Sequence, residues 1–233
     1  MDDEEPAVKV EVRGLEFGYL AKNASHLVLS DLDLDVESGS VHAVVGISGC
    51  GKSTLLRLIG GLEQPSAGII RFIGTPRYRH RTSMVFQEPR LLPWWTAERN
   101  VGIGTEFTEM PRGRFQLLKD FYLSHVGLGG MKDRLPNTLS GGQQSRVGLG
   151  RALAHDADVL LMDEPFAHLD AMSRREMHKR LESVFEGDPR TTLLVTHDVE
   201  EAVILADRVS VMRSEPGPLV ETIEVDAERP RLN

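Results

Sequence analysis

The segment GISGCGKST, at residues 46–54, holds residue types that can bind a chain of phosphates. It fits the spacing G-x-x-x-x-G-K-[ST], in which glycines let backbone N–H groups turn toward phosphate oxygens. Lys52 is expected to reach the terminal phosphates of a nucleotide, and Ser53 to supply a hydroxyl to Mg²⁺. The expected nucleotide-binding residues of this loop are Gly46, Ile47, Ser48, Gly49, Cys50, Gly51, Lys52, Ser53 and Thr54.

Two adjacent carboxylates, Asp163 and Glu164, follow the apolar run VLLM. Asp163 is expected to hold Mg²⁺ through water, and Glu164 to orient or deprotonate an attacking water. A strand that runs into an acidic turn has the same local pattern. The phosphate loop elsewhere in the chain favours the chemical interpretation.

His197 and Gln87 end two further apolar runs, TTLLVT and SMVF. Strand ends of a parallel sheet meet at one edge, so His197 is a candidate contact of a terminal phosphate and Gln87 of Mg²⁺ or the attacking water. Taken alone, each residue is more often structural. No metal-ligand spacing occurs among the eight histidines.

A second glycine-bearing helix start is LSGGQQSR, at residues 139–146. Ser140 can cap the helix that follows, and Gly141 and Gly142 can leave backbone N–H groups bare for an anion. Without further context, a helix cap is the simpler interpretation of this segment.

Strand and helix patterns alternate around these groups, which predicts a mostly parallel sheet covered by helices. Residues 7–87 and 159–225 are expected to form this nucleotide-binding β/α core. Between them, at residues 88–158, strand signals fade and prolines recur, so we expect an inserted helical subdomain. The expected fold class is α/β: a P-loop NTPase core with an N-terminal antiparallel β subdomain and the helical insertion.

The bulk composition narrows the functional classes. The chain has 233 residues, 40% of them hydrophobic, and a net charge of −8, which disfavours a nucleic-acid partner. The basic run RYRHR, at residues 77–81, is expected to be a solvated turn between strands. The single cysteine, Cys50, fits a reducing compartment, and we expect it to fill space in the loop. No run is apolar enough to span a bilayer, so we expect a cytoplasmic protein that meets a membrane through a partner.

Six elements in order resemble the ATP-binding subunit of an ABC transporter, over about residues 8–212. They are the phosphate loop, Gln87, the signature segment LSGGQ, the Asp163–Glu164 pair, the HLD segment and His197. The resemblance implies ATP and Mg²⁺ as ligands, Glu164 as the catalytic base and His197 as the γ-phosphate switch. Tyr19 is implied to stack on adenine, with Phe17 as the alternative.

The resemblance also implies an assembly. Two copies are expected to form a homodimer, in which the signature segment of one copy faces the nucleotide of the other through Ser140, Gly141, Gly142 and Gln143. Leu169 and Asp170 resemble the loop that contacts the opposite subunit, and Gln87 the link to integral-membrane permease subunits. The dimer is therefore expected on the cytoplasmic face of the cell membrane, with a solute-binding protein as an indirect partner.

The segments MVFQEPRLLPWWTAERNV and LLMDEPFAHLDAMSR resemble the importer branch for nitrate, aliphatic sulfonates and taurine. Trp94 and Trp95 either line the permease groove or are buried in the helical subdomain. The alternatives to import are a soluble ABC-type ATPase acting on nucleic acid or the ribosome, a non-catalytic regulator, and an exporter subunit.

Five positions depart from the usual pattern of this branch, and none of them removes a catalytic group. They are Ile47, Ser145, Gly148, Gly150 and His168. The two helix glycines are expected to soften the helix after the signature segment, since glycine costs a helix interior about 0.5–1 kcal/mol.

Overall fold

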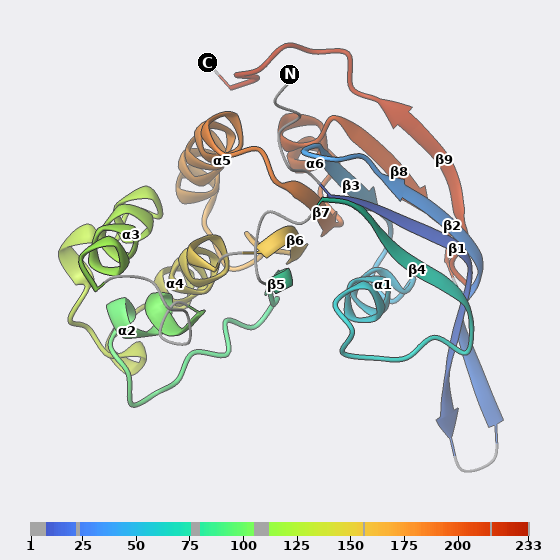
Figure 1. The fold of residues 1–233 in the computed structure, drawn as a ribbon, viewed down its shortest axis with the longest axis horizontal. Helices are drawn as coiled ribbons and strands as arrows, with labels where there is room; N and C mark the ends of the chain where they lie inside the picture. Colours follow the sequence, from blue (N-terminus) through green and yellow to red (C-terminus); the bar gives the residue numbers. More distant parts are fainter. Residues whose placement is uncertain are drawn as a thin grey trace.

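The computed structural model describes residues 8–21, 24–75, 80–104, 112–155, 157–214 and 216–232. Figure 1 shows a helical part on one side and two β-sheets on the other. The strands are β1 (Val8–Ala21), β2 (Ala24–Val36), β3 (Val41–Val45), β4 (Ala67–Gly74), β5 (His80–Val85), β6 (Ala157–Asp163), β7 (Thr191–Thr196), β8 (Arg208–Met212) and β9 (Leu219–Glu224). The helices are α1 (Lys52–Ile59), α2 (Ala97–Val101), α3 (Arg112–His125), α4 (Gly141–Ala154), α5 (Ala171–Gly187) and α6 (Val199–Leu205).

The larger sheet has six strands in the order β5-β6-β7-β3-β8-β9. Neighbouring strands from β5 to β8 run parallel, and β9 pairs with β8 in the antiparallel direction. The mostly parallel core expected from the sequence is therefore confirmed. The sequence reading missed β9, whose solvent-facing residues give it no buried apolar run.

The smaller sheet is antiparallel, with β1 between β2 and β4. Its inner face packs on α1 through Val10, Leu15, Leu29 and other apolar residues. Its outer face carries charges in contact, such as Arg13 with Asp35 at 3.0 Å. An N-terminal antiparallel β unit was expected, and the structure contains one.

The central strands are buried on both faces, which explains their uninterrupted apolar runs. Alternate residues face opposite sides of the sheet. Val44 and Leu161 pack with α1 and the antiparallel sheet, whereas Ala43 and Leu160 pack with the helices of the other side. Two hydrophobic cores thus hold the parallel strands in place from both faces.

Helices α2, α3 and α4 form the helical part, with α4 packed against the other two (Figure 1). They lie within the segment expected to be helical, and β6 begins at Ala157 rather than at residue 159. Among the described residues, no helix combines the length and the apolar character that a bilayer crossing demands.

The basic run at residues 77–81 corrects one expectation. His80 and Arg81 belong to β5, so the run is not wholly a turn. Residues 77–79 lie outside the described residues. An edge strand tolerates charged residues because its outer side meets solvent, and local sequence gave no sign of where this strand begins.

Candidate active site

Four parallel strands bring the expected catalytic residues to one edge of the core sheet. Val45 of β3 pairs with Thr196 of β7, and Asp163 of β6 pairs with Val195 of β7. Met162 of β6 pairs with Val85 of β5. The chain therefore leaves the sheet at this edge into the phosphate loop, the acidic pair, His197 and Gln87.

The phosphate loop depends on glycine at two positions of left-handed backbone, Gly49 with φ 84 and Gly51 with φ 106. A Cβ on Gly51 would also lie 2.7 Å from the Cδ2 atom of Leu29, so any other residue there would be strained and would displace Leu29. Helix α1 begins directly afterwards, and no side chain caps it. The uncapped end of a helix attracts an anion through its backbone N–H groups and its dipole.

Lys52 is folded into the loop and is only 5% exposed. Its ammonium donates hydrogen bonds to the carbonyl oxygens of Gly46 at 2.8 Å and Ile47 at 2.9 Å. Cys50 is buried, and a Cβ on Gly46 would lie 2.8 Å from its sulfur atom. The thiol thus fills space beside Gly46, and the loop places one positive charge at its centre.

Ser53 and Asp163, two of the three expected magnesium ligands, are in contact, and the described part of the chain shows no contact of the third, Gln87, with either. The Ser53 hydroxyl donates a hydrogen bond to Asp163 Oδ1 at 2.8 Å. Burial raises the pKa of the Asp163 carboxyl, and the bond from Ser53 opposes that rise. A hydroxyl and one carboxylate suit Mg²⁺, which takes its other ligands from water and substrate phosphates. Among the described residues, no cluster of three or more His, Cys, Asp or Glu side chains could hold a metal ion.

Glu164 and His197 form a second pair at the same edge, with 3.1 Å between Glu164 Oε2 and His197 Nδ1. A carboxylate in this position accepts a bond from the Nδ1–H tautomer of the imidazole. Glu164 has φ 44, and its N–H donates to the carbonyl oxygen of Val195 at 2.9 Å. A left-handed backbone costs a residue with a Cβ about 1–2 kcal/mol, and such strain is concentrated at functional sites.

The signature segment lies at the start of α4 and is closed by a capping box. Ser140 Oγ accepts from Gln143 N–H at 3.2 Å, and Gln143 Oε1 accepts from Ser140 N–H at 2.9 Å. Ser145 donates to the carbonyl oxygen of Gly141. In Figure 1, β5 and β6 lie between α4 and α1. The structure thus places the signature segment apart from the phosphate loop of its own chain.

The loop before α5 packs against this helix start. A Cβ on Gly142 would lie 3.0 Å from Leu169 Cδ2 and 3.2 Å from the carbonyl oxygen of His168. Asp170 caps α5 by accepting a bond from Ser173 N–H at 3.0 Å, and this bond lowers the pKa of Asp170. A side chain at the second glycine of the signature segment would therefore crowd this loop, and Leu169 would have to shift to accept it.

The two glycines later in α4 are buried, and the helix is continuous through them. A Cβ on Gly148 would lie 3.5 Å from Pro89, and one on Gly150 would lie 3.4 Å from Val101. Both are ordinary contact distances, so packing does not explain these glycines.

Tyr19 is 41% exposed on β1, with its ring edge-on to Phe17 at 4.9 Å between centroids. Phe17 is buried, so Tyr19 is the better placed of the two to stack on a base. Gln87 is exposed just after β5.

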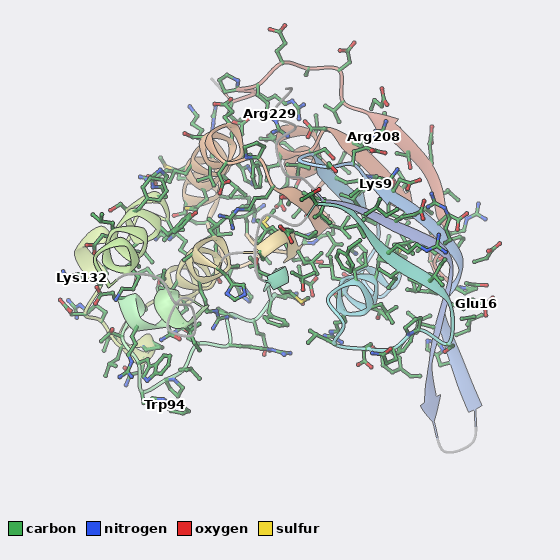
Figure 2. The ribbon with its side chains drawn as sticks, in the orientation of Figure 1. Lys9, Glu16, Trp94, Lys132, Arg208 and Arg229 are labelled. Atoms are coloured by element: carbon green, nitrogen blue, oxygen red, sulfur yellow. The ribbon has the colours of Figure 1, made fainter. Side chains whose placement is uncertain are left out.

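Trp94 is 70% exposed, whereas Trp95 is half-buried beneath the guanidinium of Arg99. Figure 2 shows Trp94 at the outer end of the helical part. The segment is held by Asn100. Its buried side-chain NH₂ group lies within hydrogen-bond distance of the carbonyl oxygens of Leu92, Trp95 and Thr96, and its Oδ1 accepts a bond from Leu92 N–H.

Sequence reasoning missed a buried pair behind this edge. His178 Nε2 and Glu201 Oε2 lie 3.9 Å apart. Burial raises the pKa of Glu201 to about 8 and lowers the pKa of His178 to about 4. Burial therefore favours the neutral form of both groups. Nothing local marks these residues, because helices α5 and α6 meet only in the folded chain.

Arg174 was also missed. It lies one helical turn after Asp170 and donates bonds to Asp198 Oδ2 at 3.2 Å and to the carbonyl oxygen of Leu169 at 3.3 Å. Its spacing from Asp170 was the available signal, since residues four apart share one face of a helix.

The class of protein follows from what converges at the sheet edge. A loop built for phosphates adjoins a buried carboxylate and a second carboxylate that can accept a proton from water, as in P-loop ATPases. Comparison with known proteins gives the narrower assignment. The chain belongs to the ABC transporter family, whose model matches residues 29–167, more than half of the chain.

Similar curated proteins include "Aliphatic sulfonates import ATP-binding protein SsuB 1" of Mesorhizobium japonicum, 44% identical over 97% of this chain and 85% of that protein. "Aliphatic sulfonates import ATP-binding protein SsuB 2" of Paraburkholderia xenovorans is 48% identical over 88% of this chain and 77% of that protein. A solved structure, the dimeric post-hydrolysis state of the ATP-binding cassette MJ0796 bound to ADP and Pi, has a TM-score of 0.83 and 27% identity, covering 94% of this chain and 100% of that one.

Proposed function

We propose that this ATPase powers solute import through a membrane permease. The observation that carries the catalytic part is the meeting of two contacts at one sheet edge, Ser53 with Asp163 and Glu164 with His197. The reaction is attack of water on the terminal phosphorus of ATP, with breakage of its bond to ADP. The importing role rests on the relatives, whose names describe import ATP-binding proteins.

Each residue has a separate task in this reaction. Lys52 and the loop N–H groups bind the phosphates, and Glu164 accepts the proton of the attacking water. His197 holds the Glu164 carboxylate in place and contacts the terminal phosphate. Mg²⁺ held by Ser53 and Asp163 would neutralise phosphate charge. Tyr19 stacks on the adenine.

The working form is a homodimer with two shared nucleotide sites. In one chain the signature segment lies apart from the phosphate loop, so a second copy has to bring its Ser140, Gly141 and Gln143 to the nucleotide. The cassette MJ0796, which resembles this chain, has been solved as a dimer. Asp170 lies on the loop that meets the opposite subunit.

The permease docks on the helical part beside Gln87. Trp94 supports this surface because an exposed aromatic ring on a fixed loop is a typical anchor of protein interfaces. Gln87 leaves the core sheet beside the acidic pair and links the catalytic edge to this surface. The dimer then lies on the cytoplasmic face of the membrane and receives solute from an external binding protein.

The solute class is an aliphatic sulfonate, by similarity to the named relatives, with taurine and nitrate as the next candidates. The test is to purify the chain together with the membrane permease that accompanies it, reconstitute the complex into vesicles and add the matching binding protein. We expect an alkanesulfonate to stimulate ATP hydrolysis and a carboxylate of equal chain length to have no effect. Stimulation by nitrate alone would reject the sulfonate class, and absence of any solute response would reject the importing role.

A further inference from the structure

Arg174, on the first turn of α5, joins two loops with different tasks. One is the loop at residues 166–170, through the carbonyl oxygen of Leu169, and the other begins α6, through Asp198. The Arg174 side chain is 34% exposed and the Asp198 side chain 28%. An ion pair of this exposure adds little to the free energy of unfolding. The main effect of Arg174 is therefore to fix the two loops relative to each other.

On one side, Arg174 fixes the residue next to the proposed switch. Asp198 follows His197, and its second carboxylate oxygen accepts a bond from Glu201 N–H at 3.2 Å to cap α6. The Asp198 N–H donates to Thr196 Oγ1 at 3.0 Å. The backbone on both sides of His197 is thereby held, and His197 in turn contacts Glu164.

On the other side, Arg174 holds the loop that packs on the signature segment. Leu169 is buried, and a Cβ at position 142 would crowd its side chain and the carbonyl of His168. A displacement of the α4 start therefore displaces the backbone at Leu169, which bonds to Arg174.

We infer that Arg174 is a positioning residue that couples the signature helix of a chain to its own His197. The planar guanidinium bonds both loops at once, which a lysine ammonium cannot do with the same geometry. In the proposed dimer, on which this inference rests, the two ends serve different nucleotides. In that dimer, the nucleotide held by the partner would contact the signature segment of a chain. Arg174 would pass the resulting movement to His197 of the same chain, at that chain's own nucleotide.

A test in the isolated chain needs no nucleotide. Gly142→Ala crowds Leu169, and amide hydrogen exchange at residues 197–201 reads the effect at the other end. We expect exchange there to rise about fivefold or more in the otherwise wild-type chain, and not to rise further when Gly142→Ala is added to Arg174→Lys or Arg174→Ala. Lys179→Ala removes a charge from an exposed position of the same helix and should leave the response intact.

The inference would be overturned if Gly142→Ala raised exchange at residues 197–201 equally with and without Arg174. It would also be overturned if Gly142→Ala did not change exchange there in the wild-type background. If Gly142→Ala does not fold, Leu169→Ala loosens the same contact and replaces it in the same scheme. The proposed function does not enter this result, so the two can fail separately.

A second arm measures turnover. Arg174→Lys should lower kcat of the assembled transporter by about 10-fold or more while ATP binding by the isolated chain changes by less than about twofold. A purely structural role would instead lower the melting temperature and spare kcat per folded molecule. Unchanged turnover in Arg174→Lys and Arg174→Ala would also overturn the inference.

Discussion

Helices α1 and α4 both begin at residues that could receive a phosphate, yet their first turns are completed differently. Helix α1 follows Gly51 and has no side-chain cap, and a buried lysine lies within the loop before it. Helix α4 follows Ser140, whose hydroxyl and N–H are both bonded to Gln143. The first helix start needs an anion, whereas the second is already satisfied at two of its polar groups.

The difference assigns unequal roles to the two helix starts. An anion at the start of α1 is bound by backbone N–H groups, the helix dipole and the Lys52 ammonium, all from one chain. At α4 the N–H groups of Gly141 and Gly142 remain beyond the capping box, which suits a lighter contact with a phosphate that another site already holds.

The largest effect should come from Glu164→Gln, because the comparison places water activation at the edge beside α1 alone. We expect hydrolysis to fall by about 10²–10⁴-fold, since an amide cannot accept the proton. ATP binding should persist, because the phosphate loop is intact. Phosphate release and equilibrium ATP binding measure the two quantities.

The matched control is Glu186→Gln, at an exposed position of α5. It should hydrolyse ATP at the wild-type rate. Near-normal turnover by Glu164→Gln would transfer the role of base to another residue.

Lys52→Ala and Ser140→Ala should separate the two helix starts. Loss of the Lys52 ammonium should weaken ATP binding by the isolated chain about 10- to 100-fold, as charge-assisted bonds to phosphate are lost. Ser140→Ala should leave that binding unchanged, lower the free energy of unfolding by about 1 kcal/mol and lower turnover of the dimer. Titration of a fluorescent ATP analogue and urea unfolding measure these effects.

Lys132→Ala, which removes an exposed lysine of the helical part, serves as the charge control for Lys52. If Ser140→Ala weakened ATP binding by the monomer as strongly as Lys52→Ala, the two helix starts would serve one site and the comparison would be wrong.

The pH dependence of stability should also separate the two regions. The buried acid Glu201 lies behind the catalytic edge, whereas the capping box of α4 contains no titratable group. The pKa of Glu201 is raised to about 8 in the folded chain, by burial and by the nearby Asp198 and Glu164, with Arg174 opposing. The folded chain keeps this proton while the unfolded chain releases it, so stability falls as pH rises from about 4.5 to about 8. His178 has the opposite effect, because its pKa is lowered to about 4 in the folded chain. Its effect is to lower the free energy of unfolding as pH falls from about 6.5 to about 4.

Glu201→Gln keeps the shape and removes the titration. Relative to wild type, its free energy of unfolding should be similar near pH 4.5 and higher by on the order of 2–4 kcal/mol at about pH 8.5. Urea unfolding across this range measures the difference. A difference that does not change with pH would show that Glu201 is ionised in the folded chain.

The smallest effects concern the stiffness of α4. Gly148→Ala and Gly150→Ala should each raise the free energy of unfolding by about 0.5–1 kcal/mol, because alanine favours the helix and its Cβ meets only ordinary contacts. Thermal unfolding should show the gain as a rise in melting temperature of roughly 1–4 °C. Gly142→Ala is the contrasting variant and should not gain, since Leu169 occupies the space. If Gly148→Ala and Gly150→Ala both lost stability, the space around these two positions would be too small for a Cβ atom.

The catalytic edge could be predicted from the sequence because each of its residues ends an apolar run. Asp163 and His197 follow strands buried on both faces, and parallel strands end together. The contacts of Arg174 and of the His178–Glu201 pair could not be predicted, because their partners come from other elements. The four-residue spacing of Arg174 from Asp170 was a local signal, but it does not point to Asp198. The neutral state of Glu201 depends on burial, which arises only when α5 and α6 pack.

The restriction at Gly142 was also invisible in the sequence. Glycine there looked like a way to bare an N–H group, and the structure adds the side chain of Leu169 as a second reason. At Gly148 and Gly150 the expected cost to the helix stands, and nothing in the packing explains why glycine is kept.

The position of β5 has a mechanical consequence. Three of the strands that lead into the catalytic edge, β3, β6 and β7, are paired on both sides, whereas β5 lies at the margin of the sheet and is paired with β6. Bending the end of an interior strand strains two ladders of hydrogen bonds, and bending β5 strains one. The sheet is therefore more rigid beneath the acidic pair than beneath Gln87. In the proposed complex, force from a docked permease would move the glutamine while the carboxylates keep their spacing.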